Sequence, residues 1–351
     1  MRLSAEPVVT LHVGTPKSGT TSLQNILARN RDLLLEYGYL YPGTNAGHFI
    51  EALSLRDSGF RGHTFERSEG AWDRVVADIM AHDGPALLSH EILGGSVPKV
   101  LKRAAKSLEG RQVRVVITCR DLGRQLPAVW QEGVKNGDTV PYGDFLADAV
   151  ESWDGAGSAR GMWRGQNLAD VGERWGSWVG NENVRFVTVP PFGADHDVLW
   201  SRFREATALP DAAYAIPSKP RNPSLGTVET ELLRRIVERL PEDVPWPTFA
   251  RQVKRRLAQR QLVKHKAGGT LTVPSDYRAE TERIAAEMVE GMRAGGFTVF
   301  GELDELRPSY REDGTSPDQV GDAELLERAL EVMVPLVLRD GAVAAKTPPG
   351  D

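Results

Sequence analysis

The sequence has 351 residues, of which 40% are hydrophobic and 26% charged, and its 43 basic and 48 acidic side chains give a net charge of −5. This composition is ordinary for a globular protein and argues against wholesale disorder. The acidic balance argues against a dedicated nucleic-acid binder, and the lack of an apolar run of membrane-spanning length predicts no transmembrane segment.

The N-terminal segment predicts a cytoplasmic protein. Its apolar run, Val8–Val13, is too short for the core of a signal peptide and continues directly into a glycine-rich loop. The chain has one cysteine, Cys119, so neither an intrachain disulfide nor a multi-cysteine metal site is expected. This cysteine usage is consistent with a reducing compartment.

Short β-branched runs alternate along the chain with long stretches of helical pattern. The runs that indicate strands are Val8–Val13, Ala86–Ser89, Val113–Thr118 and Val184–Val189. After the first of them, Leu23, Ile26 and Leu27 recur at helical spacing. Such alternation predicts an α/β fold with a central parallel sheet flanked by helices.

One domain is expected over residues 1–306. Within it, residues 138–178 mix glycines and arginines with four tryptophans, Trp153, Trp163, Trp175 and Trp178. This segment is interpreted as an insertion that covers the active site. Its tryptophans offer flat stacking surfaces, although buried tryptophans more often belong to a core.

The C-terminal part of the chain is expected to be mostly helical. Helices are predicted over residues 229–269, with a break around Pro241–Pro247, and over Tyr277–Ala294. Residues 307–351 are expected to form a polar linker, a helix at Ala323–Leu338 and a disordered tail from Ala342 onward.

A glycine-rich loop joins the first strand to the first helix, in the sequence HVGTPKSGTTSLQ. Gly14 and Gly19 lie between strand and helix, so backbone N–H groups and the positive end of the helix dipole converge on one anion. The loop is similar to a Walker A loop, but two threonines follow Gly19 and the lysine comes earlier, at Lys17. A P-loop kinase or GTPase needs Lys and Ser/Thr directly after the second glycine. The loop therefore predicts a phosphate or sulfate site, with a tight strand-to-helix turn as the alternative.

The run P-K-S-G-T-T-S-L-Q, directly after a strand, resembles the 5′-phosphosulfate loop of the sulfotransferases that use 3′-phosphoadenosine 5′-phosphosulfate (PAPS). This resemblance implies a P-loop-NTPase-like sulfotransferase fold for residues 1–306. It implies that Lys17 contacts the oxygen that bridges sulfur and phosphorus. The residues that it implies around the 5′-phosphate are Pro16, Lys17, Ser18, Gly19, Thr20, Thr21 and Ser22.

The same family binds the 3′-phosphate of PAPS with an arginine after a central strand and a serine eight residues later. Arg120 follows the strand Val113–Thr118 and matches that arginine, whereas Ala128 stands where the serine is expected. Arg124, one helical turn beyond Arg120, offers a second charge to the same phosphate. Alternatively, Arg120 caps the strand end and pairs with Asp121.

A basic segment late in the chain offers a third contact. In this family a basic, glycine-containing loop often closes the nucleotide site. Lys264 and Lys266 with Gly268 and Gly269 fit that description. The run Arg251–Lys266 contains seven Lys or Arg residues. A solvated helix face is the favoured interpretation of the run as a whole.

Sulfuryl transfer to a hydroxyl needs a base that removes the acceptor's proton. The sequence ALLSHEILGG supplies His90 and Glu91 at the end of the second strand, and members of the family use either a histidine or a glutamate as the base. Adjacent residues at a strand end point to opposite faces, so one of the two is expected to enter the cleft. The choice between them stays open, and His48 is a third candidate. No metal ion is expected, because Lys17 and the backbone donors can neutralise the leaving group.

The resemblance implies an enzyme that transfers a sulfuryl group from PAPS to a hydroxyl or amine acceptor by in-line displacement. A sugar, a glycolipid or a small metabolite is the expected acceptor. Two alternatives remain: a P-loop kinase or nucleotide hydrolase, and a non-catalytic nucleotide-binding relative, to which Ala128 points.

Overall fold

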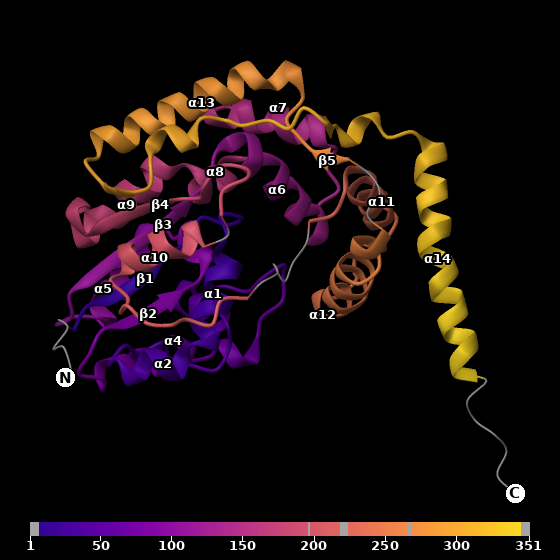
Figure 1. The fold of residues 1–351 in the computed structure, drawn as a ribbon. Helices are drawn as coiled ribbons and strands as arrows, with labels where there is room; N and C mark the ends of the chain where they lie inside the picture. Colours follow the sequence, from indigo (N-terminus) through magenta and orange to yellow (C-terminus); the bar gives the residue numbers. More distant parts are fainter. Residues whose placement is uncertain (1–6, 196, 218–223, 266–268, 345–351) are drawn as a thin grey trace, which may run out of the picture. The chain divides into compact units, whose positions relative to one another are not determined.

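The computed structural model describes residues 7–195, 197–217, 224–265 and 269–344, and Figure 1 shows the path of the chain. The chain divides into two compact units. The first draws on Met1–Gln125, Asp148–Arg221 and Tyr277–Ser309, and the second on Leu126–Ala147, Asn222–Asp276 and Tyr310–Asp351. The single domain expected over residues 1–306 stays a prediction. Among the described residues, no helix has the length and apolar character needed to cross a membrane.

A five-stranded parallel sheet forms the centre of the first unit, in the order β2-β1-β3-β4-β6. Its strands are β1 (Val9–His12), β2 (Ala86–Ser89), β3 (Val113–Cys119), β4 (Val184–Thr188) and β6 (Thr298–Phe300). Every residue of β1 and β2 is buried, as expected for parallel strands that are covered on both faces. The predicted α/β fold with a central parallel sheet is confirmed.

Strand β6, at the edge of the sheet beside β4, was not predicted from the sequence. Its register pairs Arg185 with Thr298 and Val187 with Phe300. β6 has three residues, and none of them is buried. An edge strand this short has no apolar run to distinguish it from a loop.

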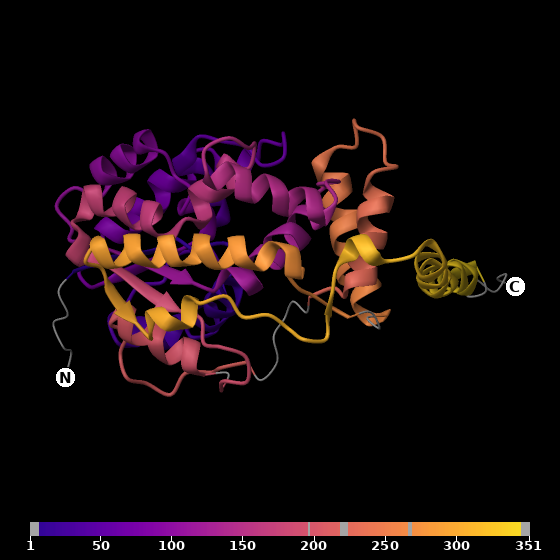
Figure 2. The same cartoon turned by 90° about the horizontal axis from the view of Figure 1, so that it is seen from above.

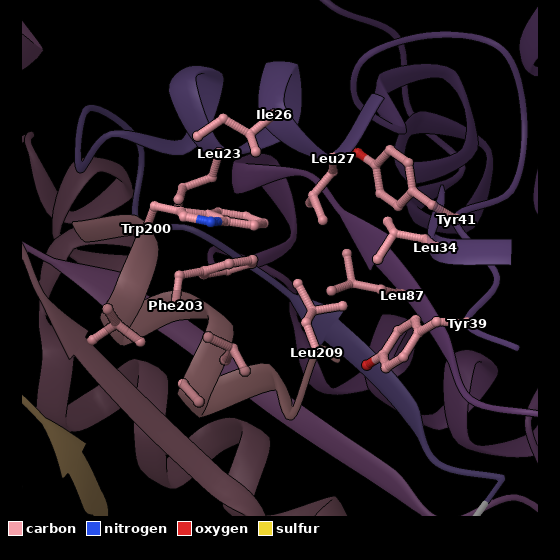
Figure 3. Packing of buried hydrophobic residues seen from close by; sticks show 13 residues of the cluster. Leu23, Ile26, Leu27, Leu34, Tyr39, Tyr41, Leu87, Trp200, Phe203 and Leu209 are labelled. Atoms are coloured by element: carbon pink, nitrogen blue, oxygen red, sulfur yellow. The ribbon is translucent and has the colours of Figure 1, made fainter. Parts of the chain in front are cut away.

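Helices cover both faces of the sheet in the first unit. They are α1 (Thr20–Arg29), α2 (Arg31–Glu36), α3 (Phe49–Arg56), α4 (Ala71–Met80), α5 (Pro98–Ser107), α8 (Arg160–Gln166), α9 (Leu168–Val179), α10 (Val198–Thr207) and α13 (Ser275–Ala294). On one face, Leu23 and Leu27 of α1 pack with Trp200 and Phe203 of α10 in a buried cluster (Figure 3). On the other face, α9 approaches β4 closely, because a Cβ on its Gly172 would lie 3.0 Å from the Phe186 ring.

The tryptophan-rich segment folds into helices, namely α7 (Tyr142–Trp153), α8 and α9. Trp163 and Trp175 are buried, and Nε1 of Trp163 donates to the carbonyl of Ala149 at 2.8 Å. Nε1 of Trp153 donates to Glu287 at 2.7 Å, on the long helix α13 that is drawn in orange in Figure 2. These tryptophans therefore pack against helices of the first unit. That the segment covers the acceptor stays a prediction.

The second unit is mostly helical. Its helices are α11 (Thr227–Val237), α12 (Trp246–Phe249), the π-helical segment Ala250–Gln259 and α14 (Asp322–Ala344), together with the later turns of α6 (Leu122–Lys135) and the first turns of α7. A small parallel pair, β5 (Thr270–Leu271) and β7 (Gly314–Thr315), completes it. The break expected around Pro241–Pro247 separates α11 from α12. The disordered tail predicted from Ala342 onward starts too early, because α14 continues to Ala344. The rest of that tail lies outside the described residues.

Candidate functional site

The candidate site lies at the carboxyl ends of β1, β2 and β3. β2 lies on one side of β1 and β3 on the other, so the connections reverse direction across the sheet between β1 and β3. In open α/β sheets, ligands bind in the crevice that such a reversal leaves beyond the strand ends. The glycine-rich loop follows β1, His90 and Glu91 follow β2, and Arg120 follows β3. The fold thus brings residues that are far apart in the sequence together at the carboxyl ends of these strands.

The glycine-rich loop has a backbone that requires glycine at two positions. Gly14 and Gly19 have φ angles of 111° and 86°. A Cβ on Gly14 would lie 3.0 Å from the Cα of Glu91, and one on Gly19 would lie 2.6 Å from Cδ2 of Leu199. Lys17 is left-handed as well, with a φ of 70°, a conformation that costs an L-residue roughly 1–2 kcal/mol. The surrounding contacts must therefore hold the loop in this shape.

Buried hydrogen bonds anchor the loop to the end of β3. The N–H of Thr15 donates to the carbonyl of Thr118 at 2.7 Å, and the N–H of Thr118 donates to the carbonyl of Gly14 at 2.5 Å. The hydroxyl of Ser18 donates to the carbonyl of Thr15 at 2.5 Å and lies 2.6 Å from the hydroxyl of Thr118. Because Ser18 is fully buried, its side chain holds the shape of the loop.

Two glutamines that the sequence analysis did not single out hold the carbonyl of Pro16. Gln125, in the first turn of α6, donates to it at 2.5 Å, and Gln166, at the end of α8, donates to it at 3.3 Å. Gln125 also donates to Oε1 of Gln166 at 2.8 Å. The one local signal for Gln125 is that an amide stands among buried apolar residues of α6.

The first turn of α1 offers donors to an anion. α1 begins at Thr20 with Gly19 as its N-cap, and its first turn contains no acidic residue. The first N–H groups of an α-helix have no acceptor within the helix, and the helix dipole places partial positive charge there. Thr20 is buried, Thr21 and Ser22 are exposed, and Lys17 is half-buried. This arrangement can bind a phosphate or a sulfate group.

Arg120 is a half-buried cation directly beyond β3. One of its terminal nitrogens donates to the carbonyl of Arg124, and its Nε is buried with no hydrogen-bond partner among the described residues. Burial lowers the pKa of Arg120 to about 10; repulsion from Arg124 acts in the same direction and attraction by Asp121 against it. Leaving a buried donor without a partner costs free energy, and an anionic ligand would supply an acceptor for this Nε.

The other nucleotide contacts expected from the sequence are Arg124 and Lys266. Each guanidinium nitrogen of Arg124 has a protein partner: Nε contacts Asp121, and the terminal nitrogens donate to the carbonyls of Pro190 at 2.9 Å and Val189 at 3.3 Å. Arg124 therefore ties the start of α6 to the end of β4. Lys266 lies outside the described residues. In the part of the chain that the structure describes, no three His, Cys, Asp or Glu side chains gather as metal ligands.

His90 and Glu91 stand where β2 leads into the 3₁₀ turn Glu91–Leu93. Nδ1 of His90 accepts from the N–H of Ile92 at 3.3 Å, so the neutral ring carries its proton on Nε2. Oε2 of Glu91 accepts from the side-chain amide of Gln24 at 3.1 Å.

The pKa values of these two residues follow from their surroundings. Burial acts to raise the pKa of Glu91, but His90, the Glu91 backbone N–H and the amide of Gln24 outweigh it and hold that pKa below its usual range. Burial lowers the pKa of His90. At neutral pH Glu91 is therefore an ionised carboxylate.

A buried polar chain runs beneath the loop and connects Thr118 to Glu91. His12, which is fully buried, has Nδ1 2.8 Å from the hydroxyl of Ser89 and Nε2 3.2 Å from the hydroxyl of Thr118. Gln24 donates to the Ser89 hydroxyl at 3.3 Å and to Glu91 at 3.1 Å. These hydrogen-bonded residues were hard to predict from the sequence, because each is a single polar residue within an otherwise apolar strand or helix.

His48, the third candidate base predicted from the sequence, is buried, and both of its ring nitrogens have hydrogen-bond partners. Its Nδ1 accepts from the N–H of Ser89 at 3.0 Å, and its Nε2 lies 3.0 Å from the carbonyl of Pro42. Both ring nitrogens are therefore used in holding the loop before α3 against the end of β2. Burial lowers the pKa of His48 to about 4.

His12 and His48 should make the fold sensitive to acid. Burial lowers the pKa of each from 6.5 to about 4. Between pH 6.5 and about pH 4, these histidines are protonated in the unfolded chain but not in the folded chain. The free energy of unfolding therefore falls as the pH drops through this range. Between about pH 7.5 and pH 5, each histidine should lower the free energy of unfolding by roughly 2 kcal/mol.

Urea unfolding of the wild type and of His48→Gln at those two pH values checks this expectation. Glutamine can replace both hydrogen bonds of the ring without titrating, so the variant should lose about half of the change due to the two histidines. An equally steep decline in His48→Gln would assign the acid sensitivity to other groups.

Comparisons with known proteins add one structural similarity. No protein-family model and no curated protein matches the sequence. Among solved structures, the chain is similar to the crystal structure of a sulfotransferase from Alicyclobacillus acidocaldarius. The two are 14% identical, the alignment covers 81% of this chain and 94% of that chain, and the TM-score is 0.47. At this level of similarity, function has to be argued from the residues of this chain.

Proposed function

We propose that this protein is a sulfotransferase that moves a sulfuryl group from PAPS to a hydroxyl-bearing acceptor. The observation that carries the proposal is a pair of cationic residues beyond adjacent strands. Lys17 stands in the loop after β1, and Arg120, whose buried Nε has no hydrogen-bond partner among the described residues, follows β3. The loop and the first turn of α1 suit a 5′-phosphosulfate, and Arg120 suits a 3′-phosphate. PAPS carries anionic groups at both of these positions.

In the proposed reaction, an acceptor oxygen attacks sulfur in line with the oxygen that bridges sulfur to the 5′-phosphate. The new O–S bond forms as the bond from sulfur to the bridging oxygen breaks. The acceptor's proton passes to a base, and adenosine 3′,5′-bisphosphate leaves. Negative charge grows on the bridging oxygen, so the ammonium group of Lys17 stabilises the transition state more than the ground state.

Glu91 suits the role of base better than His90 does. The lone pair on Nδ1 of His90 accepts the N–H of Ile92, which leaves a proton on Nε2. Glu91 is ionised at neutral pH, and it lies against the loop, because its Cα is 3.0 Å from where a Cβ on Gly14 would be. A carboxylate held beside the phosphosulfate loop can take the acceptor's proton.

Nucleotide binding tests this function. Adenosine 3′,5′-bisphosphate should bind the wild type more tightly than adenosine 5′-monophosphate does, because only the former has a 3′-phosphate. Arg120→Gln should remove roughly ten- to a hundredfold of that preference, the value of a hydrogen bond to a charged group. Isothermal titration of both nucleotides into both proteins measures it.

Arg29→Gln is the matched control, because Arg29 is an exposed arginine in the last turn of α1. Its preference for the 3′-phosphorylated nucleotide should equal that of the wild type. If Mg·ATP binds the wild type more tightly than adenosine 3′,5′-bisphosphate does, the protein is a P-loop kinase or hydrolase and the sulfotransferase proposal is wrong.

A further inference from the structure

A cavity of about 910 Å³ lies in the first unit. It is formed by α3, α4 and the loops that precede these two helices. Its size is near the upper end of the range for pockets that bind small molecules. Residues 138–178 were expected to cover the acceptor, and none of them lines this cavity.

The wall of this cavity contacts two neighbours of the candidate base Glu91, namely His90 and Gln24. Phe49, which lines the cavity, has its ring centroid 5.1 Å from that of His90. Gly47, also in the lining, is packed so closely on Gln24 that a Cβ there would lie 2.8 Å from its amide carbon. Gln24 in turn donates to Glu91 at 3.1 Å. A molecule in the cavity would therefore lie next to the residues that border the phosphosulfate loop.

One side of the cavity is aromatic. The rings of Phe49 and Phe65 meet edge to face with their centroids 5.7 Å apart, and the ring of His63 lies 4.7 Å from that of Phe65. All three residues line the cavity and are partly exposed. Partly exposed aromatic faces in a pocket suit a flat, apolar face of a ligand.

The charged groups of the lining are nearly balanced. Three carboxylates, those of Glu51, Glu66 and Asp78, face two guanidinium groups, those of Arg67 and Arg74. Oε2 of Glu51 is buried and has no hydrogen-bond partner among the described residues. Carboxylate oxygens accept hydrogen bonds and cannot donate them, so the ligand must bring donors. The near balance of charge favours a ligand that carries no net charge.

We propose that this cavity binds the acceptor, and that the acceptor is an uncharged carbohydrate. A sugar ring has an apolar face for Phe49 and Phe65, and hydroxyl donors for Glu51 and Glu66. The catalytic part of this inference rests on the proposed sulfotransferase function. Sugar binding itself needs no donor nucleotide and is measured separately.

Saturation-transfer NMR on the full chain tests the proposal with maltose, lactose and cellobiose, alongside glucuronate and glucosamine as charged probes. At least one neutral disaccharide should bind the wild type, and more tightly than either charged probe. Phe65→Ala and Glu66→Gln should each weaken that binding at least tenfold. Tyr37→Ala and Glu69→Gln are matched controls, because both residues are exposed and lie outside the lining of the cavity.

Two results would overturn the proposal. One is that no neutral disaccharide binds, or that a charged probe binds more tightly. The other is that both cavity variants, with circular dichroism spectra like the wild type, keep the wild-type affinity. A failure of the wild type to bind adenosine 3′,5′-bisphosphate is a separate outcome, because it would refute the sulfotransferase function while the measured sugar binding stands.

Discussion

Replacing Lys17 by alanine is expected to lower kcat for sulfuryl transfer roughly a hundredfold to a thousandfold, the usual effect of removing one group that stabilises charge in a transition state. Alanine keeps a Cβ at this left-handed position, so the backbone of the loop should bear the same cost as in the wild type. The affinity for adenosine 3′,5′-bisphosphate should change much less, because the ammonium group acts on charge that develops as the sulfuryl group leaves. Single-turnover transfer of labelled sulfate from PAPS measures the loss.

The matched control for this variant is Lys99→Ala, which removes an exposed lysine at the start of α5. It should retain the wild-type rate. A loss of bisphosphate affinity as large as the loss in kcat would show that Lys17 only binds the nucleotide, and would contradict its role at the bridging oxygen.

Replacing Glu91 by glutamine is expected to lower kcat roughly a hundredfold to ten-thousandfold, the range for loss of a general base. Glutamine has nearly the same shape and keeps an oxygen to accept the amide of Gln24, so the fold should be preserved. Because the pKa of Glu91 lies below its usual range, the wild-type kcat/KM should show no acid limb between about pH 6 and pH 8. Steady-state kinetics and a pH profile of both proteins measure these two effects.

The control at the neighbouring position is His90→Asn. An asparagine oxygen can accept the N–H of Ile92 in place of Nδ1, which preserves the turn and removes the imidazole. This variant should lose less than about tenfold in kcat, far below the loss expected for a base. A large loss in His90→Asn together with a small one in Glu91→Gln would identify His90 as the base.

The strands at the centre of the fold were predictable from local patterns. A parallel strand covered on both faces must be apolar along its length, and β1, β2, β3 and β4 each show such a run. β6 has three residues at the sheet edge and shows no such run. The tryptophans of residues 138–178 were interpreted as an insertion because sequence alone does not show that Trp163 and Trp175 are buried.

The candidate site was predictable where its signals are local. Gly14, Lys17 and Gly19 stand within one strand-to-helix junction, and Arg120 directly follows a strand. The contacts that position them are not local: Gln24 reaches Glu91 across 67 positions of sequence, and Gln125 reaches Pro16 across 109. Neither contact produces a recognisable spacing pattern in the sequence.

By itself, the sequence determined the glycine-rich loop and the order of strands and helices along the chain around it, because glycines, β-branched runs and helical periodicity act over a few neighbouring residues. Only the tertiary structure decided which groups surround His90 and Glu91, that Arg124 contacts Asp121 and two carbonyls, and that Phe49 in the cavity wall lies against His90. Protonation states, partners and cavities depend on burial and on hydrogen bonds between distant segments, and these exist only once the chain has folded.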